Sequence, residues 1–125
     1  MYKRDLITAE IQKLSLILAK IMGLKIEDPL FFANKITDAI AENFNLNLHE
    51  LQVLNRDQLL EKFKSSNLNA QQLDMLIKFI IPLLHNNTEN KDSLKHLLLN
   101  IYTILEVNYK FLSLENFNHA KELNT

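Results

Sequence analysis

The residue types that could hold a metal or carry out catalysis form no recognisable pattern in this sequence. No histidine stands three or four residues from another: the four are His49, His85, His96 and His119. Helical metal sites usually place ligands at those spacings, so no metal site is predicted. Asp92 and His96 are expected to form an exposed pair, four residues apart on a helix surface. With one glycine and no cysteine, neither a glycine-rich phosphate loop nor thiolate chemistry is predicted, and no catalytic residue or cofactor is expected.

Two polar residues stand inside apolar helical patterns. Glu10 lies one turn from both Leu6 and Leu14, where a carboxylate would lose hydration unless a cation or a ligand contacts it. One interpretation is a contact with a ligand or partner. The other is a rim position, or an ion pair with a lysine such as Lys78. Asn108 lies near the middle of the apolar face of the last long helical segment, between Ile101 and Leu112. A buried amide is predicted there, which would bond a neighbouring helix end or a water, set the helix register, or face a groove.

Three apolar residues lie off the main stripes of their predicted helices, and two tyrosines border one of these stripes. Leu16, Phe31 and Leu99 are either isolated exposed residues, which are ordinary, or parts of one interface patch. Tyr102 and Tyr109 are seven residues apart and border the apolar stripe of one helix. They are expected to form either the edge of the core or the rim of a groove.

The helix that positions the others is predicted over Leu73–Leu84. Its apolar residues cover nearly the whole circumference, which is typical of a buried helix. The run is about half of the ~20 residues that span a bilayer, and it contains Lys78. We therefore expect the central helix of a bundle, capped by Asn69. The residues expected to be fully buried are Leu76, Phe79, Ile80 and Leu83.

Helices are also predicted on both sides of this central segment. Apolar residues repeat every three to four positions over 3–22 and 29–44. Gly23 is typical of a helix end, and Asp28 followed by Pro29 is typical of a helix start. Because the connection is short, these two helices are expected to form an antiparallel hairpin.

The remaining segments are predicted to form three shorter helices and one long helix. Two short ones are predicted over 48–54 and 56–64, capped by Asn47 and Asn55. The long one is expected to begin at Thr88 or Asp92 and to run to about Leu112. The last one is expected over 114–123, capped by Ser113. Its predicted anchors in the core are Leu114 and Phe117.

Composition and charge narrow the class of protein. The 125 residues are 47% hydrophobic and 23% charged, which fits one globular domain spanning 1–125. Valine is rare and tryptophan absent, which favours an all-α fold. The formal net charge is -1 and the basic residues are spread along the chain, so no nucleic-acid partner is predicted. With no secretory signal and no membrane-spanning run, a cytoplasmic protein without membrane association is expected.

Two resemblances bear on the architecture. The Leu16 to Gly23 end of the first helix and the Ala33 to Ile40 spacing of the second are similar to a tetratricopeptide repeat. The signature tryptophan and proline are missing. The paired helices therefore resemble a degenerate tetratricopeptide-like superhelix, with a plain irregular bundle as the alternative. The opening of the chain, Asp5-Leu6-Ile7 with the run Leu18–Lys25, resembles the start of an uncharacterised bacterial family of small helical proteins. That resemblance covers about a fifth of the chain and implies no activity.

The function expected from these patterns is a protein-binding or assembly module of tetratricopeptide-like type. Its partner would be another protein, or a second copy that pairs helix 3–22 through Leu16, with Lys13 and Lys20 at the rim. The alternative is a small-molecule-binding bundle or an enzyme with a pocket near Glu10. A deep pocket that converges on polar groups would favour the alternative, and a shallow apolar surface would favour the binding module.

Overall fold

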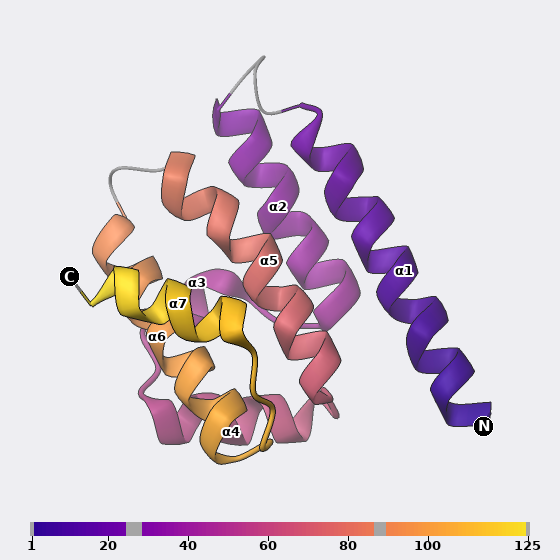
Figure 1. Cartoon of the computed structure of the whole chain (residues 1–125). Coiled ribbons are helices and arrows are strands. Elements are labelled where there is room, and N and C mark those ends of the chain that lie inside the picture. The colour runs from indigo at the N-terminus through magenta and orange to yellow at the C-terminus, as the bar shows by residue number, and fades with distance from the viewer. Residues whose placement is uncertain (1, 25–28, 87–89, 125) are drawn as a thin grey trace.

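The computed structural model describes residues 2–24, 29–86 and 90–124, and the side chains of 6–24, 29–85 and 90–124. Within these ranges the chain forms seven helices and no strand, which confirms the all-α prediction. The helices are α1 (Tyr2–Met22), α2 (Pro29–Phe44), α3 (Leu48–Leu51), α4 (Arg56–Ser65), α5 (Ala70–Asn86), α6 (Lys91–Val107) and α7 (Leu114–Leu123). Figure 1 shows α5 in the middle, with α1 and α2 on one side and α6 and α7 on the other.

Helix α5 is the centre of the bundle, as predicted, and packs against α1, α2 and α6. The four residues expected to be fully buried are at most 3% exposed: Leu76, Phe79, Ile80 and Leu83. The Phe79 ring meets Phe44 of α2 edge to face, with centroids 5.4 Å apart and an angle of 81° between the rings. None of the described helices is long and apolar enough to cross a bilayer.

The start of α5 is fixed by two reciprocal hydrogen bonds. The backbone N–H of Gln72 donates to Oδ1 of Asn69 over 2.8 Å, and the backbone N–H of Asn69 donates to Oε1 of Gln72 over 2.9 Å. This is a capping box, which confirms Asn69 as the cap. The helix continues through Pro82, which has no N–H to donate. It ends at Asn86, beyond the predicted end at Leu84.

Helices α1 and α2 form the predicted hairpin and run in opposite directions in Figure 1. Helix α1 ends at Met22, where the N–H of Gly23 donates to the carbonyl of Ala19 over 3.2 Å. Helix α2 begins at Pro29 as predicted, and the predicted cap Asp28 lies outside the described residues.

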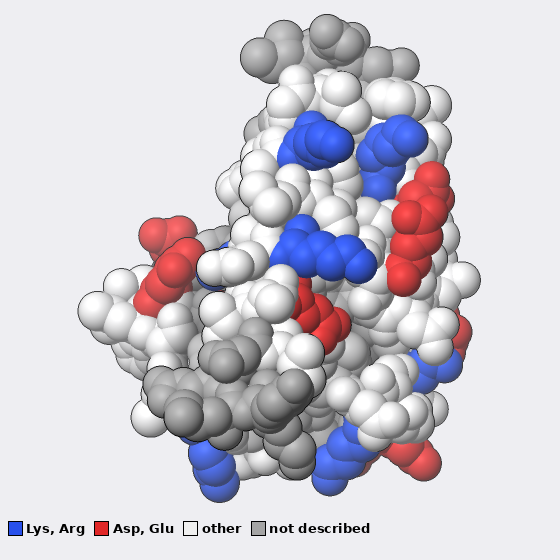
Figure 2. All heavy atoms as spheres, turned by 90° about the vertical axis from the view of Figure 1, so that its right-hand side faces the viewer, with Lys and Arg blue, Asp and Glu red and all other residues white. Residues whose placement is uncertain are grey.

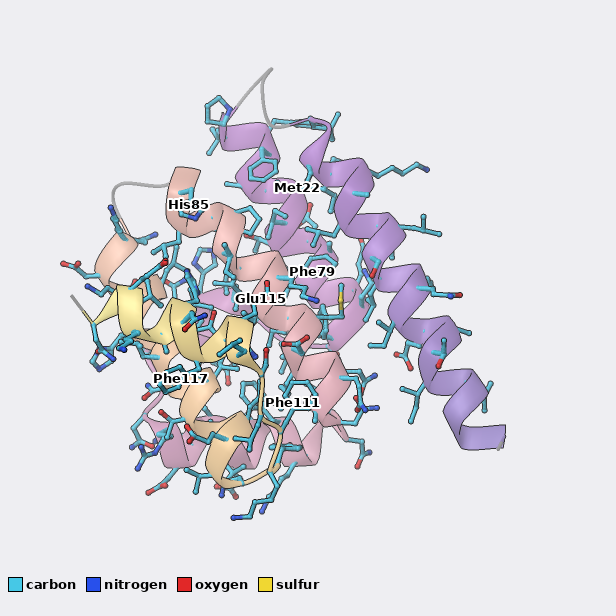
Figure 3. The ribbon with its side chains drawn as sticks, viewed as in Figure 1. Met22, Phe79, His85, Phe111, Glu115 and Phe117 are labelled. Carbon is cyan, nitrogen blue, oxygen red and sulfur yellow. The ribbon has the colours of Figure 1, made fainter. Side chains whose placement is uncertain are left out.

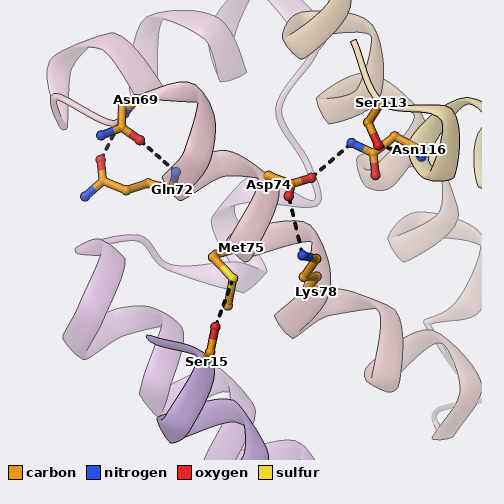
Figure 4. A network of polar contacts seen from close by, with 8 residues as sticks. All are labelled: Ser15, Asn69, Gln72, Asp74, Met75, Lys78, Ser113 and Asn116. Atoms are coloured by element: carbon orange, nitrogen blue, oxygen red, sulfur yellow. Dashed lines mark hydrogen bonds and ion pairs between the residues drawn. The ribbon is translucent and has the colours of Figure 1, made fainter. Parts of the chain in front are cut away.

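Helix α1 packs against both α2 and α5 but contributes little to the core. Among its described side chains only Leu14 and Ile21 are buried. The hydroxyl of Ser15 donates to Sδ of Met75 over 3.8 Å, which is a direct side-chain contact between α1 and α5 (Figure 4). Ile11, Ile17 and Leu18 are partly buried against the core, so one side of α1 packs on the bundle and the other side is exposed.

The two short helices start at the predicted caps. The side chain of Asn47 accepts from the N–H of Glu50 over 3.1 Å, and that of Asn55 accepts from the N–H of Gln58 over 2.9 Å. Helix α3 ends at Leu51, short of the predicted Leu54. Helix α4 is followed by a left-handed residue, Asn67, with φ of 57°. This turn directs the chain into α5.

Helix α6 is shorter at its C-terminal end than predicted, and Asn108 is not a buried amide. The helix begins at Lys91 and ends at Val107, not near Leu112. Asn108 is exposed and caps the helix, and its N–H donates to the carbonyl of Ile104 over 2.8 Å. The chain then turns because Lys110 adopts a positive φ of 54°.

Helix α7 is capped by Ser113 as predicted, but the prediction of its anchors is wrong. Leu114 is 76% exposed and Phe117 is 60% exposed. The helix packs against α6, and its buried residue is Leu123. The apolar residues at its start therefore remain at the surface.

Candidate functional site

The side of α1 that faces away from the core carries a shallow apolar hollow, which we name the α1 outer face. It has a volume of about 790 Å³ and is lined by Ala9, Gln12, Lys13, Leu16, Ile17, Ala19 and Lys20. Leu16 is 71% exposed. Because α1 turns its buried residues Leu14 and Ile21 towards α2 and α5, a residue such as Leu16 falls on the opposite side of the helix. Figure 2 views the molecule from this side and shows Lys and Arg side chains in both its upper and its lower half, with Asp and Glu side chains beside the upper ones.

The other two residues of the predicted interface patch do not join the α1 outer face. Phe31 on α2 is 46% exposed, and Nζ of Lys35 lies over its ring, 5.3 Å from the centroid. Leu99 on α6 is partly buried and packs against the core, with α5 between it and α1. Neither residue lines the hollow around Leu16, so the structure does not unite the three as one patch.

Glu10 occupies an exposed rim position rather than a pocket. Its Oε1 accepts a hydrogen bond from Nε2 of Gln72 over 2.8 Å. The hollow beside it has a volume of about 320 Å³, and Glu10 is not among its lining residues. Lys78, the cation suggested by the sequence, pairs instead with Asp74, with Nζ 3.6 Å from Oδ2. Glu10 therefore accepts a hydrogen bond from a side-chain amide of α5, and Lys78 pairs with Asp74 instead of Glu10.

Helix α7 separates two further hollows, one apolar and one polar. The α7 apolar hollow has a volume of about 360 Å³ and is lined by Tyr102, Leu105, Glu106, Phe111, Leu112, Ser113, Leu114, Asn116, Phe117 and Ala120. In the view of Figure 3, Phe111 and Phe117 lie below α7, whereas Glu115 and His85 lie above it. The hollow is apolar because Leu114 and Phe117, at the start of α7, line it and are not buried in the core.

The α5–α7 polar hollow, on the other flank of α7, has a volume of about 390 Å³. It is lined by Ile77, Lys78, Ile81, His85, Tyr102, Glu115, Asn116, Asn118, His119 and Glu122. Charged groups of both signs and two imidazoles share this hollow. Sequence spacing gave no signal for it, because its residues come from three helices.

A chain of polar contacts joins α7 to α5 next to this hollow (Figure 4). Nδ2 of Asn116 donates to Oδ1 of Asp74 over 3.0 Å. The other oxygen of Asp74, Oδ2, forms an ion pair with the ammonium group of Lys78. The backbone N–H of Asn116 donates to Oγ of Ser113 over 3.2 Å, so the residue that caps α7 also fixes Asn116. Helix α7 is thus held to α5 through a carboxylate that is itself ion-paired.

Tyr102 and His119 form the second polar connection, between α6 and α7. The Tyr102 hydroxyl is hydrogen-bonded to Nδ1 of His119, and the two rings meet edge to face with centroids 5.7 Å apart. Burial raises the pKa of Tyr102 well above its usual range, and the negative charges of Asp74 and Glu115 raise it further. The Tyr102 hydroxyl therefore stays protonated at neutral pH and serves as a hydrogen-bonding group.

Tyr109 is part of the core edge rather than of a hollow. It is partly buried and packs against the core. Its hydroxyl donates to the carbonyl of Leu68 over 3.3 Å. Burial raises the pKa of Tyr109 above its usual value. Of the two tyrosines predicted to rim a groove, only Tyr102 lines the hollows beside α7.

Among the described residues, no group of three or more His, Cys, Asp or Glu side chains is placed to hold a metal ion. No protein-family model, no curated protein and no solved structure matches the chain.

Proposed function

We propose that this chain is a protein-binding module that docks its partner on the α1 outer face. The observation that carries the proposal is Leu16, which is 71% exposed in the middle of a continuous hollow. A single exposed leucine is ordinary in a folded protein. Here, however, Leu16 lies beside Ile17 on a helix that covers one side of the bundle and is itself left uncovered on its outer side.

The residues around Leu16 indicate the chemistry of the partner. Ala9 and Ala19 are small, so a partner helix can approach the α1 backbone closely. Among the side chains that the structure describes, the charged residues that line the hollow are Lys13 and Lys20, and no carboxylate lines it. A fitting partner therefore presents an apolar anchor with carboxylates at its edge, as an amphipathic helix does.

The proposal includes a tetratricopeptide-like arrangement of the hairpins. In such an array each hairpin buries its faces against its neighbours, and an end face stays open unless a polar capping element covers it. The hairpin of α1 and α2 stands at one side of the bundle in Figure 1, and α1 forms the outermost helix there. An open end face at α1 is what such an array offers to a partner.

Site-specific photo-crosslinking in cells tests the proposal. A benzophenone amino acid replaces Leu16 in one variant. In the control it replaces Val53, which is 80% exposed and lies in the connection between α3 and α4. We expect a defined crosslinked product from position 16 and none from position 53. Adding Lys13→Glu and Lys20→Glu should remove the product, because the carboxylates of the partner would then be repelled. Equal crosslinking from both positions would contradict the proposal.

The second candidate function, a ligand-binding bundle, is favoured by a different observation. The α5–α7 polar hollow brings Lys78, Glu115 and His119 around one space of about 390 Å³, within the size range of small-molecule sites. A polar ligand with both donors and acceptors would fit this lining. Thermal-shift screening with His119→Ala as the control would reveal a ligand whose stabilisation depends on this hollow.

A further inference from the structure

We infer that the partner of the α1 outer face is the α7 apolar hollow of a second copy of this chain, so that copies join head to tail. This inference rests on the proposed function and names its partner. It starts from the fact that the molecule has two uncovered apolar surfaces. One lies around Leu16 on α1, and the other lies around Phe117 at the start of α7.

The positions of the two surfaces prevent one copy from covering both by itself. Figure 1 shows α1 along one side of the molecule and α7 on the other, with α5 between them. Each copy therefore offers one surface of each kind. Two copies can satisfy one pair of surfaces and still leave one of each open.

The two surfaces differ in depth. On the α1 outer face, Leu16 is an exposed side chain within a broad and shallow hollow that Ala9 and Ala19 also line. The α7 apolar hollow is a smaller and more enclosed space of about 360 Å³ that includes Phe111 and Phe117. In this contact Leu16 would lose its exposure to water against Phe111 and Phe117, and well-packed, desolvated positions of this kind carry most of the binding energy of an interface.

Charge favours this pairing over a symmetric pairing of two α1 outer faces. Of the described charged side chains, Lys13 and Lys20 line the α1 outer face, and both are basic. The charged residue that lines the α7 apolar hollow is Glu106. The longer segment 106–123, which includes α7, carries three carboxylates and two lysines. One of those lysines, Lys121, lies over the Phe117 ring, with Nζ 5.8 Å from its centroid. Pairing α1 with α1 would bring four lysines together, whereas pairing α1 with the hollow joins opposite charges.

A contact of this kind has a defined consequence for assembly. Because different surfaces meet, the interface is heterologous, and it builds a ring if the rotation closes or an open chain if it does not. A two-fold dimer through α1 alone, the arrangement suggested by the sequence, would stop at two copies. The size distribution therefore separates the two arrangements.

Sedimentation velocity on the full chain, from roughly 10 to 500 μM, tests the inference with two variants. Leu16→Glu disables the α1 outer face, and Phe117→Glu disables the hollow. Both positions are exposed, at 71% and 60%, so the monomer should fold, as circular dichroism can check. Wild-type protein should form species that grow with concentration. Each variant alone should weaken association by at least about tenfold, because a carboxylate would be desolvated in the contact.

The decisive measurement is an equimolar mixture of the two variants. The Leu16→Glu chain keeps its hollow and the Phe117→Glu chain keeps its α1 outer face, so the mixture should form dimers and nothing larger. Wild-type association without recovery in the mixture would overturn the inference. So would a dimer that Leu16→Glu abolishes and Phe117→Glu leaves intact, although the binding role of α1 would then stand. A monomeric wild type that still crosslinks another protein at position 16 would overturn the inference and leave the proposed function in place.

Discussion

Replacing Phe79 by alanine tests whether α5 is the centre of the fold. Phe79 is fully buried, and its ring contacts Phe44 edge to face at 5.4 Å. A buried Phe→Ala change costs about 3–5 kcal/mol through lost burial and the cavity that remains. That range includes the loss of the aromatic pair, which contributes about 0.5–1.5 kcal/mol. We therefore expect Phe79→Ala to lower the free energy of unfolding by about 4 kcal/mol.

Urea titration followed by circular dichroism at 222 nm measures this loss. With a denaturant slope of about 2 kcal/mol per molar urea, the midpoint should fall by about 2 M. The matched control is Phe117→Ala, since Phe117 is 60% exposed and should cost less than about 1 kcal/mol. A loss below about 1 kcal/mol for Phe79→Ala, or equal losses for the two variants, would refute the placement of α5 in the core.

Three further expectations concern the polar contacts. Gln72→Glu should destabilise the protein by about 0.5–1 kcal/mol, because a carboxylate then faces Glu10, and adding Glu10→Gln should restore most of the loss in urea titration. The free energy of unfolding should fall as the pH rises above about 10, because the pKa of Tyr102 is raised in the folded state and the unfolded chain therefore loses the hydroxyl proton at a lower pH. In an alkaline titration, the Tyr102→Phe variant should show a smaller fall. Ser113→Ala should speed amide hydrogen exchange in α7 about fivefold, from the loss of about 1 kcal/mol of capping energy, while exchange in α5 stays unchanged.

The parts of the fold that follow from local chemistry were predictable from the sequence. The apolar circumference of Leu73–Leu84 identified the buried helix, because few arrangements other than a core satisfy such a surface. Asn55, Asn69 and Ser113 were predictable as caps, because a side chain that accepts from an N–H two or three residues onward needs no tertiary contact.

The end of α6 was not predictable from the apolar pattern. Phe111 and Leu112 continue the spacing of the helix, so periodicity alone extends it to Leu112. The helix ends instead because Lys110 adopts a left-handed conformation that usually calls for glycine. Without a glycine, nothing in the residue types marks this turn. Asn108 then became a cap rather than a buried amide.

The hollows beside α7 were not predictable because their contacts join residues far apart in the sequence. Asn116 meets Asp74 across 42 positions, and His119 meets Tyr102 across 17. The spacing of histidines along a helix indicates neighbours on the same helix. It does not indicate a hydrogen-bond partner on another helix. By contrast, Leu16 was identifiable from one helix alone, because its place opposite the apolar stripe is a property of α1.

The central position of α5 also affects how the chain folds during its synthesis. Helix α2 presents an apolar side to α5, including Phe32, Ile36 and Phe44, and the last residue of α5 follows Phe44 by 42 positions. At translation rates of about 5–20 residues per second, the apolar side of α2 stays exposed for roughly 2–8 seconds before all of α5 has been synthesised. The side of α5 that packs against α6 then stays exposed until α6 has been synthesised. The nascent chain thus carries exposed apolar surface through most of its synthesis, and this is the period in which a chaperone would protect it.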